Sequence, residues 1–250
     1  MLRMVLRRSV AVVAVCMVTA CGARAGDEIP STAQVTGSAS ATQPASPVAS
    51  AAGGAGSSAD LSARLLTADS VPPGFIVEAA AAVTVSDAGD ERPGADESCS
   101  ESTIPLLSAR RLTGTPSAMA GATLSYAGDP GGFWVGIEVL RTYADDSARR
   151  AMSDLRTIIR RCPTVVLTSG FAAGNRYRFA VAPGPRIGDD SMHARCSMTY
   201  GSKTLRCDSL LVRIGTTLVV IHEEGNGPGG DRYLAPLAEA AIRRYAVTGS

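Results

Sequence analysis

Aromatic residues make up only 4% of this 250-residue chain, and lysine occurs once, at Lys203. Arginine and alanine are abundant instead, which indicates the codon bias of a GC-rich genome rather than affinity for nucleic acid. The formal net charge is +1, and no stretch of the chain is strongly basic. Because a nucleic-acid-binding protein needs a basic surface that displaces counterions from phosphates, the composition argues against a nucleic-acid partner.

The N-terminus has no apolar run long enough to span a bilayer, which takes ~20 residues. Residues 10–20 are mostly apolar, and they follow Arg3, Arg7 and Arg8. This order is typical of a secretory signal peptide, here over residues 1–20. Its removal takes three of the 24 basic residues and none of the 23 acidic ones, so the mature chain has 21 against 23 and a charge near −2.

The signal peptide ends in Val-Thr-Ala-Cys-Gly at residues 18–22. This resembles the bacterial lipobox, in which small residues precede a cysteine. The resemblance implies that the Cys21 thiol receives a diacylglycerol and that the chain is cleaved before Cys21. Two or three acyl chains, such as palmitate, anchor a protein stably. We therefore expect a lipoprotein held on the extracytoplasmic side of the cell membrane; the alternative is an ordinary secretory signal with an incidental cysteine.

Residues 21–59 combine the lipidated cysteine with a segment of Ala, Ser, Gly, Thr and Pro. Such a segment cannot bury enough apolar surface to offset the entropy of ordering it, so we expect a disordered tether. A flexible chain of this length spans ~35 Å on average. Residues 60–250 remain for a single globular domain.

Hydrophobic periodicity predicts three helices in that domain. A short one is capped by Asp60 and carries Leu61, Leu65 and Leu66. The clearest helix begins at Asp145 or Asp146 and ends at Cys162, before Pro163. A last helix covers about residues 231–245, and a helical turn is expected near residues 104–107, after a polar loop at 86–98.

Period-two alternation predicts strands over most of the remaining domain. In one of them Phe133, Val135, Ile137 and Val139 alternate with other residues, so we expect these four to form its buried face. Helices and strands do not alternate regularly, which favours an α+β fold with an antiparallel sheet of about six to eight strands. The expected strands lie near residues 75–77, 122–126, 133–141, 165–167, 176–181, 192–200, 203–213 and 216–222.

Four cysteines remain in the expected domain, an even number that favours disulfides outside the cytoplasm. A two-residue turn at Gly201-Ser202 would place Cys196 directly opposite Cys207. This is a hydrogen-bonded pair, which accommodates a disulfide less easily than the closer non-hydrogen-bonded kind, and a small bulge could relieve the strain. Cys99 then pairs with Cys162 by elimination. The competing interpretation, a metal site, lacks CxxC spacing, so we expect no metal.

Motifs of catalysis and cofactor binding are incomplete. Residues 225–230 match GxGxxG, but the chain ends before the further strand and acidic residue that a dinucleotide site needs. His222 begins an HExxH pattern whose second histidine is missing, and neither GxSxG nor SxxK is present. His193 and His222 could each serve a serine, although both lie in predicted strands, where histidines are usually structural. We therefore expect no enzyme, no cofactor and no catalytic residue, and a Trp134 that belongs to the core.

The order of elements resembles the PknH-like extracellular sensor domain of actinobacteria, found on receptor kinases and on free lipoproteins. The matching segments are residues 65–69, residues 143–148 opening the long helix that ends at Cys162, Cys207 with residues 212–220, and the closing helix at 234–245. The resemblance covers about residues 60–246. It implies a central antiparallel sheet, two disulfides and a cleft for an unknown ligand, and no catalytic residues. The related family of Mog1/PsbP-like lipoproteins has a similar sheet and is the alternative.

Three functions follow, in order of preference. The first is a lipid-anchored, non-enzymatic binding or sensor-type domain of the cell envelope, which an apolar cleft would favour. The second is a structural or protein-interaction lipoprotein serving envelope or secretion machinery, which an exposed flat apolar patch would favour. The third is an envelope hydrolase, which would need His193 or His222 within reach of a serine and a carboxylate. The sequence gives neither the ligand nor the oligomeric state.

Overall fold

The structure is a computed structural model, and it describes residues 57–84, 99, 112–127, 132–167, 173–226 and 231–247. These residues belong to one compact unit, Ala51–Ser250. The expected signal peptide, Cys21, most of the expected tether, the polar loop at 86–98 and the helical turn at 104–107 lie outside the described residues. No helix within the described ranges is long and apolar enough to cross a membrane.

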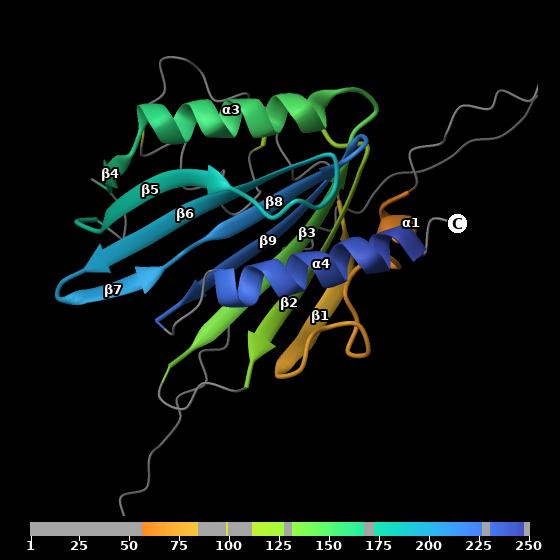
Figure 1. Ribbon diagram of the computed structural model, residues 1–250, viewed down its shortest axis with the longest axis horizontal. Helices are drawn as coiled ribbons and strands as arrows, with labels where there is room; N and C mark the ends of the chain where they lie inside the picture. Colours follow the sequence, from red (N-terminus) through yellow and green to blue (C-terminus); the bar gives the residue numbers. More distant parts are fainter. Residues whose placement is uncertain are drawn as a thin grey trace, which may run out of the picture. The chain divides into compact units, whose positions relative to one another are not determined.

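The described residues form a nine-stranded antiparallel sheet with helices on both faces, which confirms the α+β prediction (Figure 1). The described helices are α1 (Ser58–Ser62), α3 (Ser147–Arg161) and α4 (Asp231–Val247). The strands are β1 (Phe75–Val83), β2 (Ala118–Tyr126), β3 (Trp134–Thr142), β4 (Thr164–Val166), β5 (Arg176–Pro183), β6 (Asp190–Tyr200), β7 (Lys203–Arg206), β8 (Ser209–Ile214) and β9 (Thr217–Gly225). They follow the order β1-β2-β3-β9-β7-β6-β5-β4 across the sheet, and β8 pairs with β6 and β9.

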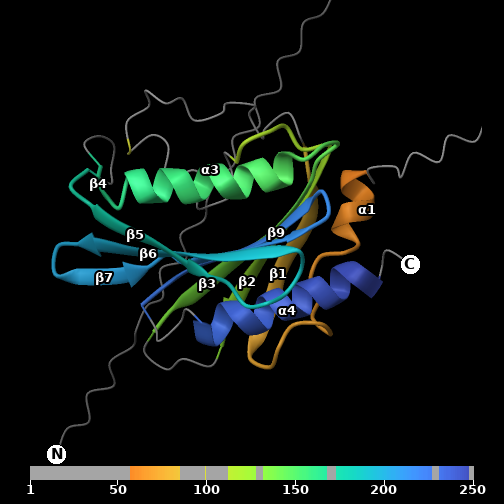
Figure 2. The same ribbon diagram turned by 45° about the horizontal axis from the view of Figure 1, so that its top comes forward.

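The helices α3 and α4 lie on opposite faces of the sheet (Figure 2), and a separate hydrophobic core lies under each of them. In β9, Leu218 and Val220 pack under α3, whereas Val219 and Ile221 pack under α4. Successive side chains of a strand point to opposite faces, so a strand covered on both sides is apolar throughout. We call the two clusters the α3-side core and the α4-side core.

The helix α3 presents one apolar face to the sheet and begins much as the sequence predicts. Asp146 occupies the N-cap position, but it is Asp145 whose side chain accepts a hydrogen bond from the Ser147 N–H, at 2.9 Å. Hydrogen bonds from Ser147 and Arg150 lower the pKa of Asp145 to about 2. The side chains that α3 buries recur at intervals of three and four, as a helix packed on one face requires: Ala148, Ala151, Met152, Leu155, Ile158 and Ile159.

The helix α1 differs from the prediction at both ends. Its N-cap is Ser57 rather than Asp60, and the Asp60 carboxylate accepts a hydrogen bond from the Ser57 N–H at 2.9 Å. This reciprocal arrangement is a capping box, in which an acidic residue three positions into the helix supports the cap. The helix ends at Ser62, so Leu65 and Leu66 enter the α4-side core from the following turn rather than from the helix.

The strand β3 buries the face opposite to the predicted one over most of its length. Val135 and Ile137 are exposed, at 45% and 36%, and Phe133 beside the strand at 46%. Trp134 and Leu140 are buried instead, and of the four predicted residues only Val139 is buried. The described helix on that side, α3, packs on β5 and β8. Alternation shows that two faces differ, but only the position of the helix decides which one is covered.

Trp134 is confirmed as a core residue, with 4% of its surface exposed. It belongs to an aromatic group in the α4-side core. The ring centroid of Phe75 lies 5.1 Å from that of Trp134 and 4.8 Å from that of Tyr126, and Tyr233 of α4 closes the group at 5.7 Å from Phe75. Tilted and edge-on contacts of this kind contribute beyond the buried area alone. Four of the chain's eleven aromatic residues thus meet where α4 packs on the sheet.

Candidate functional site

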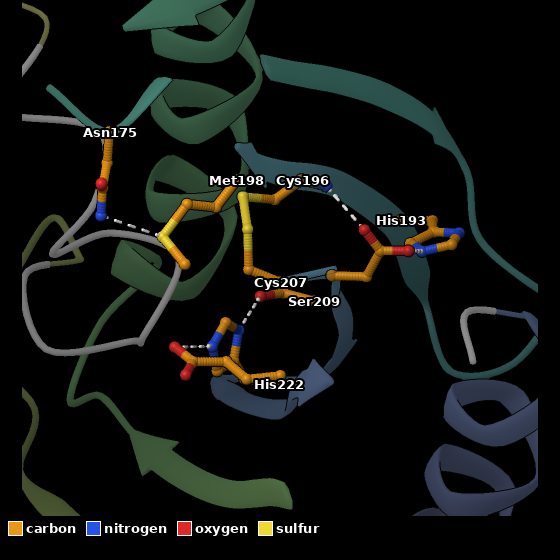
Figure 3. Close-up of a disulfide and its surroundings, with 9 residues drawn as sticks. Asn175, His193, Cys196, Met198, Cys207, Ser209 and His222 are labelled. Atoms are coloured by element: carbon orange, nitrogen blue, oxygen red, sulfur yellow. Dashed lines mark hydrogen bonds and ion pairs between the residues drawn. A yellow bond between two sulfur atoms is a disulfide. The ribbon is translucent and has the colours of Figure 1, made fainter. Parts of the chain in front are cut away.

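The hairpin of β6 and β7 carries the disulfide between Cys196 and Cys207 (Figure 3). Gly201 has a φ of +57°, as the turn requires, and the register places Ser197 opposite Arg206. The same register continues to Ala194 opposite Ser209, so no bulge is present and the two cysteines lie directly opposite each other, with Cα atoms 4.8 Å apart. The second expected disulfide, Cys99–Cys162, is present as well, with Cα atoms 5.6 Å apart.

At this disulfide a side chain, rather than a bulge, interrupts the backbone hydrogen bonds between the two strands. The Cys207 N–H donates to the Cys196 carbonyl at 3.0 Å, but the Cys196 N–H donates to the Asp208 carboxylate at 2.6 Å. The buried carboxylate therefore takes the place of a backbone carbonyl, which is why the single strand predicted over 203–213 is divided into β7 and β8. Asp208 also lies 3.3 Å from Nε2 of His193, on the same face of the sheet as Leu210.

A second polar group lies on the opposite face of the sheet and joins a serine, a histidine and a carboxylate. The Ser209 hydroxyl lies 2.8 Å from Nδ1 of His222, and Nε2 of His222 lies 3.6 Å from the Glu224 carboxylate (Figure 3). The hydrogen bond from His222 lowers the pKa of Glu224, and partial burial opposes this shift. This is the combination that the hydrolase hypothesis requires. However, Ser209 is completely buried, and a nucleophile must reach its substrate.

Four arginines converge on one face of β5, β6 and β7. The register places Arg178, Ser197 and Arg206 in one row across the three strands. Arg176 lies two residues before Arg178 on the same face, and Arg195 lies two residues before Ser197. This is the face that carries α4 farther along the sheet, where the helix packs on β8 and β9. We call these four side chains the arginine face.

A hollow of about 320 Å³ opens on the arginine face. A second hollow of about 200 Å³ adjoins it, because both are lined by Ser197 and Arg206. The larger one is lined by Arg178, Phe179, Ala180, Arg195, Cys196, Ser197, Arg206 and Asp208. The site therefore combines positive charge and a hydroxyl with a floor stiffened by the disulfide.

The sequence analysis missed this site. The sequence contains no strongly basic stretch, because the four arginines are divided among three strands. Arg195 and Arg206 lie 19 and 30 residues after Arg176 in the chain. The hairpin register predicted around Gly201 already places Arg206 opposite Ser197, two residues after Arg195. The proximity of these two arginines could therefore have been predicted from the sequence. The pairing of β5 with β6, which completes it, is a long-range contact.

An exposed apolar strip is the other surface feature. Its members share the face of β1 and β3 that lies on the α3 side of the sheet, because Ile76 and Val135 both lie opposite Ser125. The strip consists of Ile76, Val135 and Ile137 in the strands and Phe133 beside them, and each is at least 36% exposed. Exposed apolar residues that gather in one place often mark an interaction surface.

Two glutamates are buried in the α4-side core. Glu138 is fully buried, and its Oε2 accepts a hydrogen bond from the Leu66 N–H at 2.8 Å. Burial raises the pKa of Glu138 from 4.5 to about 7, and the hydrogen bond from Leu66 opposes the shift. Glu223 of the neighbouring strand accepts a hydrogen bond from Trp134 Nε1 at 2.7 Å. Neither glutamate is among the residues that line the two hollows described above.

No protein-family model matches the chain, and no curated protein matches it. Among solved structures, the chain is similar to the extracellular domain of PknH from Mycobacterium tuberculosis. The sequence identity is 15% and the TM-score is 0.47, over 75% of this chain and 94% of that chain. This is the domain that the sequence resemblance named. A function for the present chain therefore has to come from its own residues.

Proposed function

We propose that this protein is a lipid-anchored, non-enzymatic binding or sensor-type domain of the cell envelope, and that its ligand occupies the hollow on the arginine face. The observation that carries the proposal is the hollow of about 320 Å³, into which three arginines and a serine converge from adjacent strands. Its volume falls within the ~300–1,000 Å³ of small-molecule sites.

The compartment follows from the two disulfides and from the N-terminal sequence. Disulfides form and persist where the environment is oxidising, as outside the bacterial cytoplasm. A lipid on Cys21 and a tether over residues 21–59 would hold the domain at an average distance of ~35 Å from the membrane. From there it would sample ligands of the envelope without leaving the membrane surface.

A steric block tests the site without removing any charge. Ala180 lines the hollow and is exposed, so Ala180→Trp should fill it while leaving the arginines in place. The full chain, produced in an actinobacterial host and extracted from the envelope in detergent, should retain a small molecule in native mass spectrometry. The Ala180→Trp chain should lose that molecule, and the matched Ala182→Trp chain, altered two residues farther along the same strand, should keep it. A folded wild-type chain that never retains a molecule would contradict the proposal.

The anchor is tested separately. Metabolic labelling with a palmitate analogue should mark the wild-type chain and leave the Cys21→Ser chain unlabelled, with the second chain released from the membrane fraction. Labelling that survives the substitution, or a protein found in the cytosol with reduced cysteines, would refute the proposed location.

A second candidate function, a structural or protein-interaction lipoprotein, is favoured by the apolar strip on β1 and β3. Val135→Asp/Ile137→Asp should abolish capture of an envelope partner by in vivo crosslinking if the strip is the functional surface. The same pair of substitutions should leave ligand retention unchanged if the hollow is the functional surface. The two functions are thus separated by variants on opposite faces of the sheet.

A hydrolase is disfavoured because Ser209, the serine that contacts His222, is completely buried in the α3-side layer. Ser209→Ala should leave ligand retention intact and should change no hydrolytic activity towards generic esters. A fluorophosphonate probe that labels Ser209 in the folded chain would reverse this conclusion.

A further inference from the structure

We infer that β1 is a docking edge for a partner protein, which adds to it an extended segment that carries alternating apolar residues and a lysine or arginine. This inference goes beyond the proposed function, because the hollow lies on β5, β6 and β7, in the other half of the strand order. It rests on the free edge of β1, on the apolar strip that begins there and on the charge of Glu78.

The two edges of the sheet differ in how they are protected. One edge is β4, which has three residues and follows Pro163, and such a short strand offers little backbone for further pairing. The other edge is β1, which has nine residues and contains no lysine, arginine or proline (Figure 1). Among the described residues, those from 76 to 83 hydrogen-bond only to β2. The outer N–H and C=O groups of β1 are therefore available to another strand.

A bulge at Glu78 divides β1 and leaves its second half regular. The register with β2 shifts between Val77 and Ala79, and from Ala79 to Val83 the residues pair with β2 one by one. The alanines from 79 to 82 are all exposed, although α1 contacts β1. Because successive residues of a strand point to opposite faces, this half of β1 is open on both faces. An added strand can therefore lay larger side chains beside the alanines on either face.

The apolar strip makes one face of the edge more favourable for an added strand. Ile76 of β1 and Val135 of β3 lie in one row, because Ser125 of β2 pairs with both. An added strand extends this row, and its side chains on that face bury Ile76 and are themselves removed from water. When a segment binds by strand addition, its backbone provides hydrogen bonds and its alternate side chains provide specificity. We therefore expect apolar residues at alternate positions of the partner segment.

The charge of Glu78 identifies the kind of partner. Glu78 is the only exposed charge in β1, β2 and β3, since Glu138 and Arg141 are fully buried. One of its oxygens accepts a hydrogen bond from the Ser125 hydroxyl at 2.5 Å, and no ion pair joins it to another described residue. Opposite charges on neighbouring strands stabilise a sheet. A lysine or arginine of the partner segment meets this carboxylate.

Two other occupants fit the edge less well. A second copy of β1 brings no cation to Glu78, because β1 contains no basic residue. The hydrocarbon of a bilayer offers no hydrogen-bonding groups to an open sheet edge, and anionic headgroups repel a carboxylate. A strand of another protein supplies both the backbone groups and the cation.

Nuclear magnetic resonance of the nitrogen-15-labelled full chain in non-ionic detergent tests the inference with a synthetic peptide. The probe is a short peptide of alternating valine and threonine with one lysine, and it should shift the amide signals of β1 while leaving those of β4 unchanged. The same peptide with glutamate in place of lysine should bind about fivefold more weakly at low ionic strength. A peptide N-methylated at every backbone amide cannot donate to the edge and should shift no β1 signal.

Variants of the chain separate the charge from the edge. Glu78→Gln should still bind the lysine peptide but should no longer distinguish it from the glutamate peptide. Ala81→Lys protects the edge with a charge and should weaken binding by about tenfold. The matched control Ala182→Lys lies in β5, which has a strand on either side, and should change binding less than twofold. The thermal unfolding midpoint of each variant checks that it is folded.

Several results would overturn the inference: no shift of β1 signals, equal binding of the N-methylated peptide, or wild-type binding by folded Ala81→Lys. Self-association that Ala81→Lys abolishes in analytical ultracentrifugation would assign the edge to a second copy instead. Shifts of β1 signals by micelles that contain phosphatidylglycerol, without any by the peptide, would assign it to the membrane surface. Because Ala81→Lys should retain the molecule held in the hollow, failure of this inference leaves the proposed function standing.

Discussion

The two cores of this protein share one sheet but are held together by different means. All four paired cysteines belong to the α3-side core or pack against it, and its buried charge is the cation of Arg141, whose Nε donates to the Tyr143 hydroxyl at 3.0 Å. The α4-side core has the aromatic group and two buried glutamates, and none of the described disulfides. Covalent links thus stabilise one face, whereas aromatic packing and buried hydrogen bonds stabilise the other.

This difference has a consequence for the conditions under which each side is stable. Reduction should loosen the α3 side, because its long helix is tied by Cys162 to Cys99. A change of pH should act on the α4 side, because Glu138 is buried there with a raised pKa. Reduction and pH therefore affect the stability of opposite faces of one sheet, and a substitution can remove each effect.

The largest expected effect is the loss of the disulfide between Cys99 and Cys162. Cys99→Ser/Cys162→Ser releases a constraint that spans 63 residues, and the chain-entropy model predicts a loss of about 4 kcal/mol in the free energy of unfolding. The Cys196→Ser/Cys207→Ser pair spans 11 residues and should lose about 3 kcal/mol. Urea denaturation followed by circular dichroism measures both. A larger loss for the short hairpin would show that native-state geometry, rather than chain entropy, controls the α3 side.

The next effect concerns Glu138 and the pH dependence of stability. Because its pKa is raised to about 7 in the folded state, the folded protein binds more protons than the unfolded chain between pH 4.5 and 7. The free energy of unfolding should therefore fall by about 3 kcal/mol as the pH rises from 4.5 to 7, and then stay constant.

Glu138→Gln should remove that slope and make the protein more stable than the wild type at pH 8. Urea titrations at several pH values give the curve, and Glu239→Gln on the exposed side of α4 serves as the control. A slope that persists in the Glu138→Gln chain would assign it to another group.

A smaller effect is expected from the hydrogen bond between Trp134 and Glu223. Trp134→Phe keeps an aromatic ring in the α4-side core but leaves the Glu223 carboxylate without the indole donor 2.7 Å away. A hydrogen bond to a charged group contributes about 2 kcal/mol, and the thermal unfolding midpoint should fall accordingly. If Trp134→Phe/Glu223→Gln is no less stable than Trp134→Phe, the cost comes from the charged Glu223 carboxylate that has lost the indole donor. An unchanged midpoint in Trp134→Phe would show that this hydrogen bond does not contribute to stability.

The smallest effect is expected on the apolar strip, where neither core is involved. Val135→Thr/Ile137→Thr should change the free energy of unfolding by less than about 0.5 kcal/mol, because both side chains are exposed. Val139→Thr is the matched control on the same strand and face, and it should lose about 1–3 kcal/mol because Val139 is buried in the α3-side core. Equal losses at the exposed and buried positions would mean that the strip is covered in the folded protein.

The sequence by itself determined the local elements and the short-range links. Periodicity located α3, α4 and most strands, because an amphipathic element carries its own pattern. The turn at Gly201 also fixed the register that brings Cys196 to Cys207, since a two-residue hairpin leaves one pairing.

Only the tertiary structure decided which side of each element is covered and which strands become neighbours. In the folded protein Val135 and Ile137 are exposed, and the Asp208 carboxylate takes the role expected of a bulge. Arg178, Arg195 and Arg206 come together from three strands. Strand order and helix docking are set by contacts between residues far apart in the chain, and the local periodicity of a segment does not specify which distant segment it will contact. The proposed site is a concentration of positive charge in a nearly neutral chain, and it forms only when the strands that carry the arginines pair with one another.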